Sequence, residues 1–239
     1  MNNPDQDPHL FETTPSTVRR IADAQIVILN GADYDPWMAT LIRVAPHPGR
    51  TVIDVADLTG RRAGDNPHLW YDPATMPAAA KAMAAAFAAA DLAHKADYNA
   101  RLKTFIASLK PINDKIAAIR ARFAGAPVTA SEPVFGPMAA ALGLTMRNEK
   151  FQLAIMNGTE PSARDVASFE SDLKQRTVKV MFVNKQAADK AVERLVNIAR
   201  EARVPIVGVT ETQPAGTTYQ NWMLNQLNET EKALAGPSS

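Results

Sequence analysis

Apolar side chains recur at every third or fourth residue over a long stretch in the middle of the chain. They lie at Tyr98, Leu102, Phe105, Leu109, Ile112, Ile116, Ile119 and Phe123. Steps that alternate between four and three residues place all these side chains along one face of an α-helix. The 26 residues from Tyr98 to Phe123 would extend about 39 Å as a helix. Such a helix is typical of a spine that joins two lobes, although a long packing helix within one domain would have the same pattern.

Pro111 lies inside this stretch. Proline lacks an amide hydrogen, and its ring clashes with the preceding helical turn. Because the apolar stripe keeps its phase across Pro111, we expect a kink at this point and not the end of the helix.

Short apolar runs alternate with helical patterns on both sides of this stretch. We expect helices near residues 14–16 and at 35–44, 72–92, 134–142, 162–175, 187–202 and 219–234. We expect buried strands at residues 24–29, 51–55, 127–131, 178–183 and 205–209. Strands that alternate with helices indicate parallel βαβ units, so the sequence predicts an α/β fold.

Composition excludes several classes of function. The chain has no cysteine, so disulfides, thiolate metal sites, iron–sulfur clusters and cysteine nucleophiles are excluded. The 26 Lys and Arg residues balance 25 Asp and Glu residues, whereas nucleic acids and anionic membranes select a basic excess. We therefore expect no nucleic-acid partner. No apolar run reaches the about 20 residues that a membrane helix needs, so we expect a chain that does not span a membrane.

Two acidic residues lie within two residues of the ends of predicted strands. Glu132 comes after the strand at 127–131, and Glu211 comes after the strand at 205–209. In open parallel sheets, ligands bind at the carboxyl ends of the strands. Both carboxylates are therefore candidate site residues, although either could be a solvated acid in a loop.

Two short segments of the first half are near-copies. Residues 7–11 read Asp-Pro-His-Leu-Phe, and residues 66–70 read Asn-Pro-His-Leu-Trp. The proline before His9 and before His68 restricts the backbone, which lowers the entropy lost when the imidazole is held in place. A hydrogen bond at the start of a helix is the alternative role for each histidine. The other two histidines, His47 and His94, lack this context, and we expect them on the surface.

Two imidazoles and two carboxylates from four separate loops form a candidate metal site. Imidazole suits zinc, iron, nickel and copper, whereas carboxylate suits manganese, magnesium and calcium. The mixed set His9, His68, Glu132 and Glu211 therefore suits Mn(II), Fe(II) or Zn(II).

With these motifs, the chain resembles the metal-binding substrate-binding proteins of ABC importers for zinc, manganese and iron, over almost its whole length. The motifs that carry the resemblance are residues 7–9 with 14–16, 30–31, 66–70, 160–162, 209–212 and 218–223. The resemblance implies two lobes with parallel sheets flanked by helices, one long spine helix and a metal ion in the interlobe cleft. The implied domains are an N-terminal lobe at 1–96, a linker helix at 97–124 and a C-terminal lobe at 125–239.

The resemblance also implies the metal ligands. The N-terminal lobe would supply His9 and His68. The third position is His in zinc members and Glu in manganese members, and here it is Glu132. The fourth is usually Asp, and here Glu211 stands in its place with one additional methylene group.

The metal that the resemblance favours is manganese or iron over zinc. Zinc members often carry a loop rich in His and Asp between the first two ligands, and none occurs between His9 and His68. Glu132 at the third position also favours manganese over zinc. Zn(II) nevertheless binds most protein sites more tightly than Mn(II) does, which limits this preference.

The implied function is the capture of one divalent ion of manganese, iron or zinc and its delivery to an ABC permease in the inner membrane. Four protein ligands leave little open coordination, whereas a catalytic metal site needs an open position, so we expect no enzymatic activity. A metalloenzyme with two histidines and one carboxylate, and a metal-independent adhesin or scaffold, are the alternatives.

The start of the chain departs from the family pattern. Eight residues precede His9, whereas family members have a strand, a helix and a strand before this motif. Residues 1–5 show neither the basic nor the apolar region of a signal peptide. We therefore expect a truncated extracytoplasmic protein whose N-terminal lobe exposes a strand edge and an apolar face. Lower stability of this lobe, or an oligomer that covers the gap, would follow.

Overall fold

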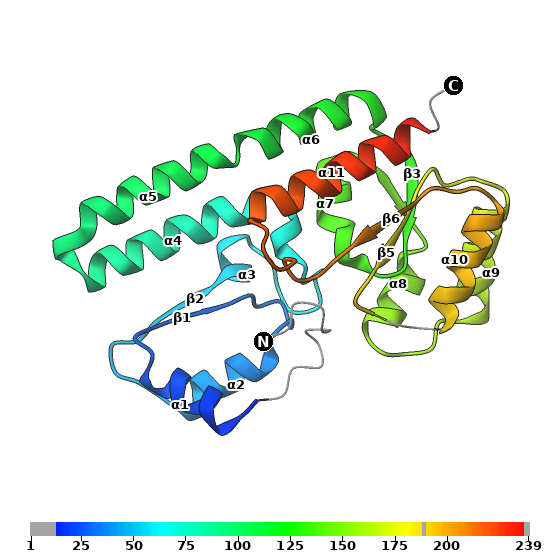
Figure 1. Ribbon diagram of the computed structural model, residues 1–239. Helices are drawn as coiled ribbons and strands as arrows, with labels where there is room; N and C mark the ends of the chain where they lie inside the picture. The colour runs from blue at the N-terminus through cyan, green and yellow to red at the C-terminus, as the bar shows by residue number, and fades with distance from the viewer. Residues whose placement is uncertain (1–12, 188–189, 237–239) are drawn as a thin grey trace. The chain divides into compact units, whose positions relative to one another are not determined.

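The computed structural model describes residues 13–187 and 190–236 (Figure 1). The chain divides into two compact units, which separate between Lys110 and Pro111. Each unit contains a parallel sheet with helices packed beside it, so the predicted α/β fold is confirmed. The predicted boundaries, with residues 97–124 as a separate linker, stay a prediction.

The unit up to Lys110 contains a two-stranded parallel sheet. Its register pairs Ile26 with Thr51 and Leu29 with Asp54. Figure 1 shows α1 and α2 on one side of this sheet and α4 on the other, where α4 also packs against α5. The elements are α1 (Pro15–Asp23), β1 (Ile26–Leu29), α2 (Pro36–Val44), β2 (Thr51–Asp54), α3 (Val55–Leu58), α4 (Thr75–Ala90) and α5 (Lys95–Ser108).

Two helices of this unit begin close to the residues at which the sequence predicted them to begin. Thr14 caps α1, because its Oγ1 atom accepts a 3.2 Å hydrogen bond from the backbone nitrogen of Thr17. The alanine-rich helix begins at Thr75, three residues after the predicted start at Asp72. The Asp72 carboxylate instead accepts a 2.9 Å hydrogen bond from the backbone nitrogen of Ala74, which forms a turn before the helix.

The unit from Pro111 contains a four-stranded parallel sheet in the order β4-β3-β5-β6. Figure 1 shows α9 and α10 together on one side of this sheet and α7 and α11 on the other. The strands are β3 (Pro127–Ala130), β4 (Thr145–Arg147), β5 (Met181–Asn184) and β6 (Ile206–Val209). The helices are α6 (Lys110–Phe123), α7 (Gly136–Ala141), α8 (Glu149–Met156), α9 (Ala163–Lys174), α10 (Lys190–Glu201) and α11 (Tyr219–Ala235).

Strand β5 occupies a central position in this sheet. It pairs with β3 on one side, where Ala130 lies opposite Phe182, and with β6 on the other, where Val209 lies opposite Asn184. The three strands are parallel, so their carboxyl ends lie at the same edge of the sheet. Residues that directly follow β3 and β6 therefore flank the end of β5.

The long central helix is interrupted where the sequence predicts a kink. Helix α5 ends at Ser108 and α6 begins at Lys110, with Leu109 between them. Pro111 is the second residue of α6. The first amide groups of a helix have no acceptor within the helix, so a proline at this position costs no helical hydrogen bond. Its ring restricts the preceding turn, which explains why the interruption precedes the proline.

Two elements of this unit were not predicted from the sequence. Strand β4 is only three residues long and lies at the edge of the sheet. Helix α8 follows Asn148, whose left-handed backbone (φ 61°) makes a tight turn between the two elements. A strand this short has too few residues for its alternation to be recognised.

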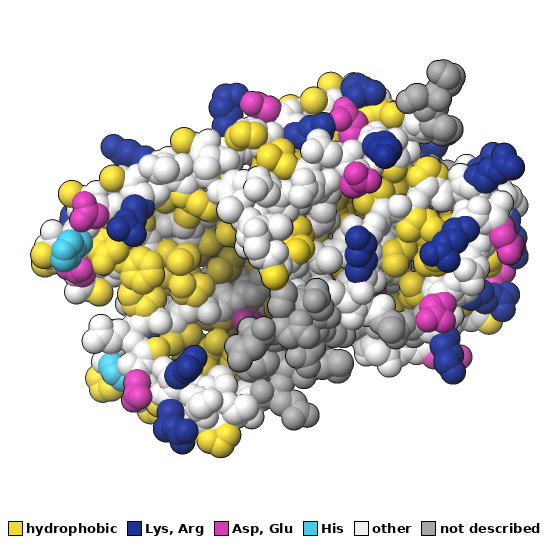
Figure 2. All heavy atoms as spheres, in the orientation of Figure 1, with side chains coloured by type: hydrophobic (Ala, Val, Ile, Leu, Met, Phe, Trp, Pro, Cys, Tyr) yellow, Lys and Arg dark blue, Asp and Glu magenta, His cyan; other side chains and the backbone are white. Residues whose placement is uncertain are grey.

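The surface carries charges of both signs. Figure 2 shows lysine and arginine side chains interspersed with aspartate and glutamate on the face drawn, and hydrophobic side chains gathered over α4 and α5. A groove of about 380 Å³ lies between these two helices and is lined largely by apolar side chains, among them Met83, Phe87 and Phe105. Among the described residues, none of the helices is both long enough and apolar enough to cross a bilayer.

Candidate metal centre

Glu132 and Glu211 lie at the carboxyl-end edge of the four-stranded sheet. Glu132 follows β3 and Glu211 follows β6, as the sequence predicted. Both are buried, with 7% and 4% of their surface exposed. They are therefore not solvated loop acids. Burial of a carboxylate is unfavourable unless hydrogen bonds or a positive charge compensate for the lost hydration.

Asn184, the last residue of β5, lies between these two carboxylates. Its Nδ2 atom donates a 2.7 Å hydrogen bond to Glu132 Oε2 and another of 2.7 Å to Glu211 Oε1. Only 3% of Asn184 is exposed. The two acids thus converge on one amide nitrogen, and Asn184 reaches both because β5 lies between β3 and β6.

Gln186 holds the loop that carries Glu211. Its Oε1 atom accepts hydrogen bonds from the backbone nitrogens of Glu211, at 2.5 Å, and of Thr212, at 3.2 Å. Its Nε2 atom lies 2.5 Å from Thr212 Oγ1. One side chain therefore fixes the backbone on which the Glu211 carboxylate is carried.

His68 is fully buried in the other unit. Asn66 Oδ1 lies 2.8 Å from its Nδ1 atom and accepts a 3.0 Å hydrogen bond from its backbone nitrogen. Because an amide oxygen only accepts hydrogen bonds, Nδ1 carries the hydrogen and Nε2 is the basic nitrogen of the ring. The His68 side chain forms no hydrogen bond at the start of the following turn, so the alternative role of this histidine is not observed.

The loop that carries His68 is attached to the end of β1. Asn30 donates from Nδ2 to the carbonyl oxygen of Pro67 at 2.9 Å. The next residue, Gly31, has a φ of 75°, and a Cβ atom there would lie 2.0 Å from Asp54 Oδ1. Glycine is therefore required beside the anchor of this loop.

The remaining histidines differ from His68. His9 lies outside the described residues. His94 is exposed and its Nδ1 atom lies 2.8 Å from Asp91 Oδ2, in agreement with a surface position. His47 is half-buried in its turn.

No group of three or more His, Asp or Glu side chains that could hold a metal ion occurs within residues 13–187 and 190–236. The described residues bring two of the four predicted ligands together, namely Glu132 and Glu211, through Asn184. His68 lies in the unit up to Lys110.

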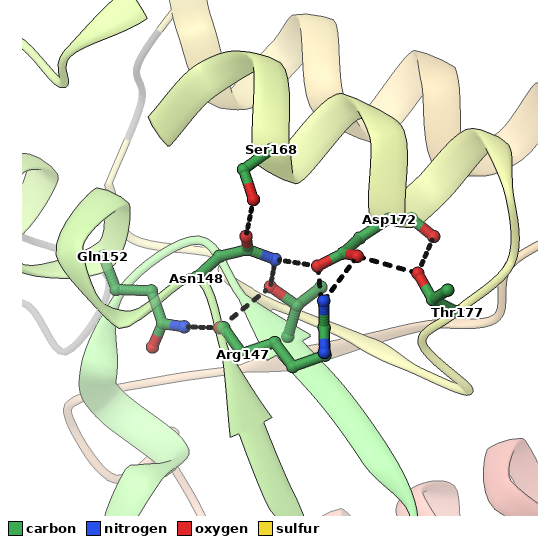
Figure 3. A network of polar contacts seen from close by, with 7 residues as sticks. Arg147, Asn148, Gln152, Ser168, Asp172 and Thr177 are labelled. Atoms are coloured by element: carbon green, nitrogen blue, oxygen red, sulfur yellow. Dashed lines mark hydrogen bonds and ion pairs between the residues drawn. The ribbon is translucent and has the colours of Figure 1, made fainter. Parts of the chain in front are cut away.

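A second polar cluster lies at the β4 edge of the four-stranded sheet. The Arg147 guanidinium forms two 2.8 Å hydrogen bonds to the Asp172 carboxylate, which also accepts from Asn148 at 3.0 Å and from Thr177 at 2.8 Å (Figure 3). Burial favours a higher pKa for Asp172, but these hydrogen bonds outweigh it and lower the pKa below its ordinary value. The cluster links β4 and the turn before α8 to α9.

The comparison with known proteins identifies the family. Residues 1–233 match the family model of ZnuA, described as zinc-uptake complex component A, periplasmic. The chain belongs to this family. The predicted resemblance to metal-binding substrate-binding proteins of ABC importers is therefore confirmed.

Relatives of this ZnuA-family chain have names that refer to two metals. The manganese ABC transporter substrate-binding lipoprotein PsaA of Streptococcus mitis is 24% identical over 250 residues, which cover 96% of this chain and 79% of PsaA. The high-affinity zinc uptake system protein ZnuA of Bacillus subtilis is 20% identical over 251 residues, which cover 95% of this chain and 77% of that protein.

The fold is shared with solved structures. The periplasmic zinc binding protein TroA from Treponema pallidum has a TM-score of 0.77 at 20% identity, with 97% of this chain and 88% of the TroA chain covered. The prediction of parallel sheets flanked by helices and a long central helix is thus confirmed.

Three side chains that contact predicted ligands or their loops were not assigned a role from the sequence. Asn184 and Gln186 lie at and just beyond the end of β5, and Asn66 lies two residues before His68. The rule that located Glu132 and Glu211 also applies to the end of β5. Asparagine is not one of the residue types that usually bind transition metals, so its position alone indicated no role.

Proposed function

We propose that this chain captures one divalent transition metal ion with His9, His68, Glu132 and Glu211, and delivers the ion to an ABC permease. Family membership supports metal transport, since relatives are named as manganese and zinc transport proteins. The structural observation that carries the proposal is the buried pair Glu132 and Glu211, both bonded to Asn184.

Such a pair is suited to a cation. Two neighbouring ionised carboxylates repel each other. A divalent ion would compensate both charges and would offset the hydration that the carboxylates lose on burial. His68 would add a neutral imidazole ligand through Nε2, with Nδ1 held by Asn66.

The donor set supports manganese or iron as cargo, with zinc as the competing ion. Two carboxylates and two imidazoles supply both hard oxygen and intermediate nitrogen donors, a combination that suits Mn(II) and Fe(II). Zn(II) accepts the same donors and binds most protein sites more tightly than Mn(II) does, so it would also bind.

We infer that the chain is a binding protein and not an enzyme, that it acts outside the cytoplasm and that its partner is a membrane permease. The ZnuA family model describes a periplasmic component of an uptake complex. Membership in this family favours transport over the metalloenzyme and the metal-independent adhesin or scaffold that the sequence also allowed. The balance of charged residues continues to support the prediction that nucleic acid is not a partner.

Thermal unfolding tests the proposal. An ion that binds only the native state raises the melting temperature, by about 5–10 °C when its concentration is a hundredfold above Kd. We expect this rise with Mn(II), Fe(II) or Zn(II) and not with Mg(II), which prefers oxygen ligands and retains its water. Identical melting curves with and without every transition metal would contradict the proposal.

We also propose that the unit up to Lys110 is either less stable than its neighbour or covered by a second copy. Apolar side chains support this, because Ile28 on β1 is 37% exposed and Val52 on β2 is 45% exposed. Light scattering after size exclusion tests the oligomer, and separate melting transitions test the difference in stability. A stable monomer that melts in one cooperative transition would contradict both.

A further inference from the structure

Asn184 is buried between the two acidic residues of the proposed site. Its amide group is neutral, so Asn184 is not itself an anionic metal ligand. Each hydrogen of its amide group is directed to a different carboxylate, Glu132 Oε2 and Glu211 Oε1, at 2.7 Å. These are charge-assisted hydrogen bonds if the carboxylates are ionised, and bonds of that kind are about twice as strong as neutral ones.

The orientation of the Asn184 amide is determined by its other contacts. Its Oδ1 atom accepts a 3.0 Å hydrogen bond from the backbone nitrogen of Gln186. Its own backbone nitrogen donates a 3.0 Å hydrogen bond to Ser131 Oγ, the residue directly before Glu132. A reversed amide would place its oxygen against two carboxylate oxygens and would lose the bond from Gln186, so the nitrogen must face the acids.

We propose that Asn184 is a positioning residue that holds Glu132 and Glu211 as a preassembled pair for the metal ion. This inference rests on the proposed function. The amide engages one oxygen of each carboxylate and thereby restricts the direction in which the other oxygen points. Loss of these two hydrogen bonds would remove a restraint that the two acids share, and metal binding would have to supply that ordering.

The neutrality of Asn184 is part of this role. A lysine or arginine between the two acids would compensate their charge and would compete with the incoming cation. An amide donates two hydrogen bonds and carries no net charge, so it adds no positive charge that would compete with the ion. Asn184 therefore orders the ligands without occupying the place of the cargo.

A competition titration with Mn(II) and with Zn(II) measures the effect. Removal of a side chain that orients metal ligands lowers affinity about 10–100-fold, and we expect this loss in Asn184→Ala. Asn184→Ser retains one hydroxyl donor in place of two amide hydrogens, so its affinity should fall between that of the wild type and Asn184→Ala. The matched control is Asn197→Ala, since Asn197 is exposed on α10 and its Oδ1 atom accepts a 3.2 Å hydrogen bond from Arg200.

The absorption spectrum of bound Co(II) separates positioning from general stability. Band position and intensity report the number and geometry of the ligands, which a change in stability alone does not alter. We expect both Asn184 variants to change the spectrum of the Co(II)-loaded protein and Asn197→Ala to leave it unchanged.

The outcomes distinguish this inference from the function on which it rests. If the wild type binds metal and Glu132→Ala abolishes binding, but the Asn184 variants keep the wild-type affinity and Co(II) spectrum, the positioning role is wrong and the proposed function stands. If the wild type binds none of the metals, the proposed function is wrong, and the inference is wrong with it.

Discussion

Glu211 accepts its 2.7 Å hydrogen bond from the same Asn184 nitrogen that donates to Glu132. The two acids follow different strands, and they converge because the strand between them ends in an asparagine. The contact of each acid with Asn184 therefore depends on the length of its side chain as well as on its charge.

Glu211→Asp tests this dependence on length. Removal of one methylene group withdraws the carboxylate by about 1.5 Å, which is too far for the present bond to Asn184. Although the charge is preserved, we expect the affinity for Mn(II) to fall about tenfold or more. A metal titration measures the effect, and an affinity equal to that of the wild type would contradict the proposed contact.

Asn66→Ala tests the orientation of His68. Without Asn66 Oδ1, the hydrogen on Nδ1 loses the acceptor that lies 2.8 Å away, and the ring can change its tautomer. We expect the affinity for Zn(II) to fall about tenfold or more. The control is Asp91→Asn, which changes the partner of the exposed His94 and should leave metal affinity unchanged. Equal effects of the two variants would count against a specific role for Asn66.

Gly31→Ala tests the end of β1. The new Cβ atom would meet Asp54 Oδ1 at 2.0 Å, on a backbone with a φ of 75°. Gly49→Ala is a matched control, because Gly49 has a φ of 78° but a Cβ atom added there would have no neighbouring atom within 4 Å. Left-handed backbone strain alone is about 1–3 kcal/mol, and we expect a larger loss of unfolding free energy for Gly31→Ala. Urea denaturation measures both, and equal losses would show that the contact with Asp54 is relieved.

Acid should destabilise the unit that contains Glu170 and Glu231. A hydrogen bond from Lys115 lowers the pKa of Glu231, and a hydrogen bond from Lys174 lowers that of Glu170, in each case below the ordinary value of 4.5. The unfolded chain therefore binds these protons at a higher pH than the native state does. Their stabilising contribution is complete above pH 4.5 and is lost as the pH falls through the lowered pKa values.

The measurement for this acid effect is the urea midpoint at pH values from 7 to 3. We expect the midpoint to fall below pH 4.5, and Glu231→Gln to reduce the size of this fall because it removes one of the titrating groups. A midpoint that stays constant over the whole range would contradict the expectation.

The sequence predicted the positions of Glu132 and Glu211 because the rule it used depends only on strand order and direction. Each acid lies two residues after the last residue of a strand, and parallel strands bring such positions to one edge. The same rule applied to Asn184, but the sequence does not show that β5 lies between β3 and β6 in the sheet. That strand order gives the asparagine its two acidic partners.

Other features depend on interactions that a local pattern does not contain. Strand β4 forms through its pairing with β3, and the turn after it is stabilised by the contact between Asn148 and Asp172. Thr14 and Ser162, in contrast, lie at the starts of helices that the sequence predicted, and each accepts a hydrogen bond from a backbone nitrogen three residues away. Short-range hydrogen bonds can be predicted from spacing, whereas pairing between distant strands cannot.

The most direct test of the account is the metal content of the purified chain. The protein is stripped with a chelator, exposed separately to Mn(II), Fe(II) and Zn(II), desalted and analysed for metal per chain. His68→Ala and Glu132→Ala are measured beside the wild type, with His94→Ala as a matched control. The account predicts one ion per chain in the wild type and in His94→Ala, and its loss in the other two variants. Equal metal in all four proteins, or no metal in the wild type, would contradict it.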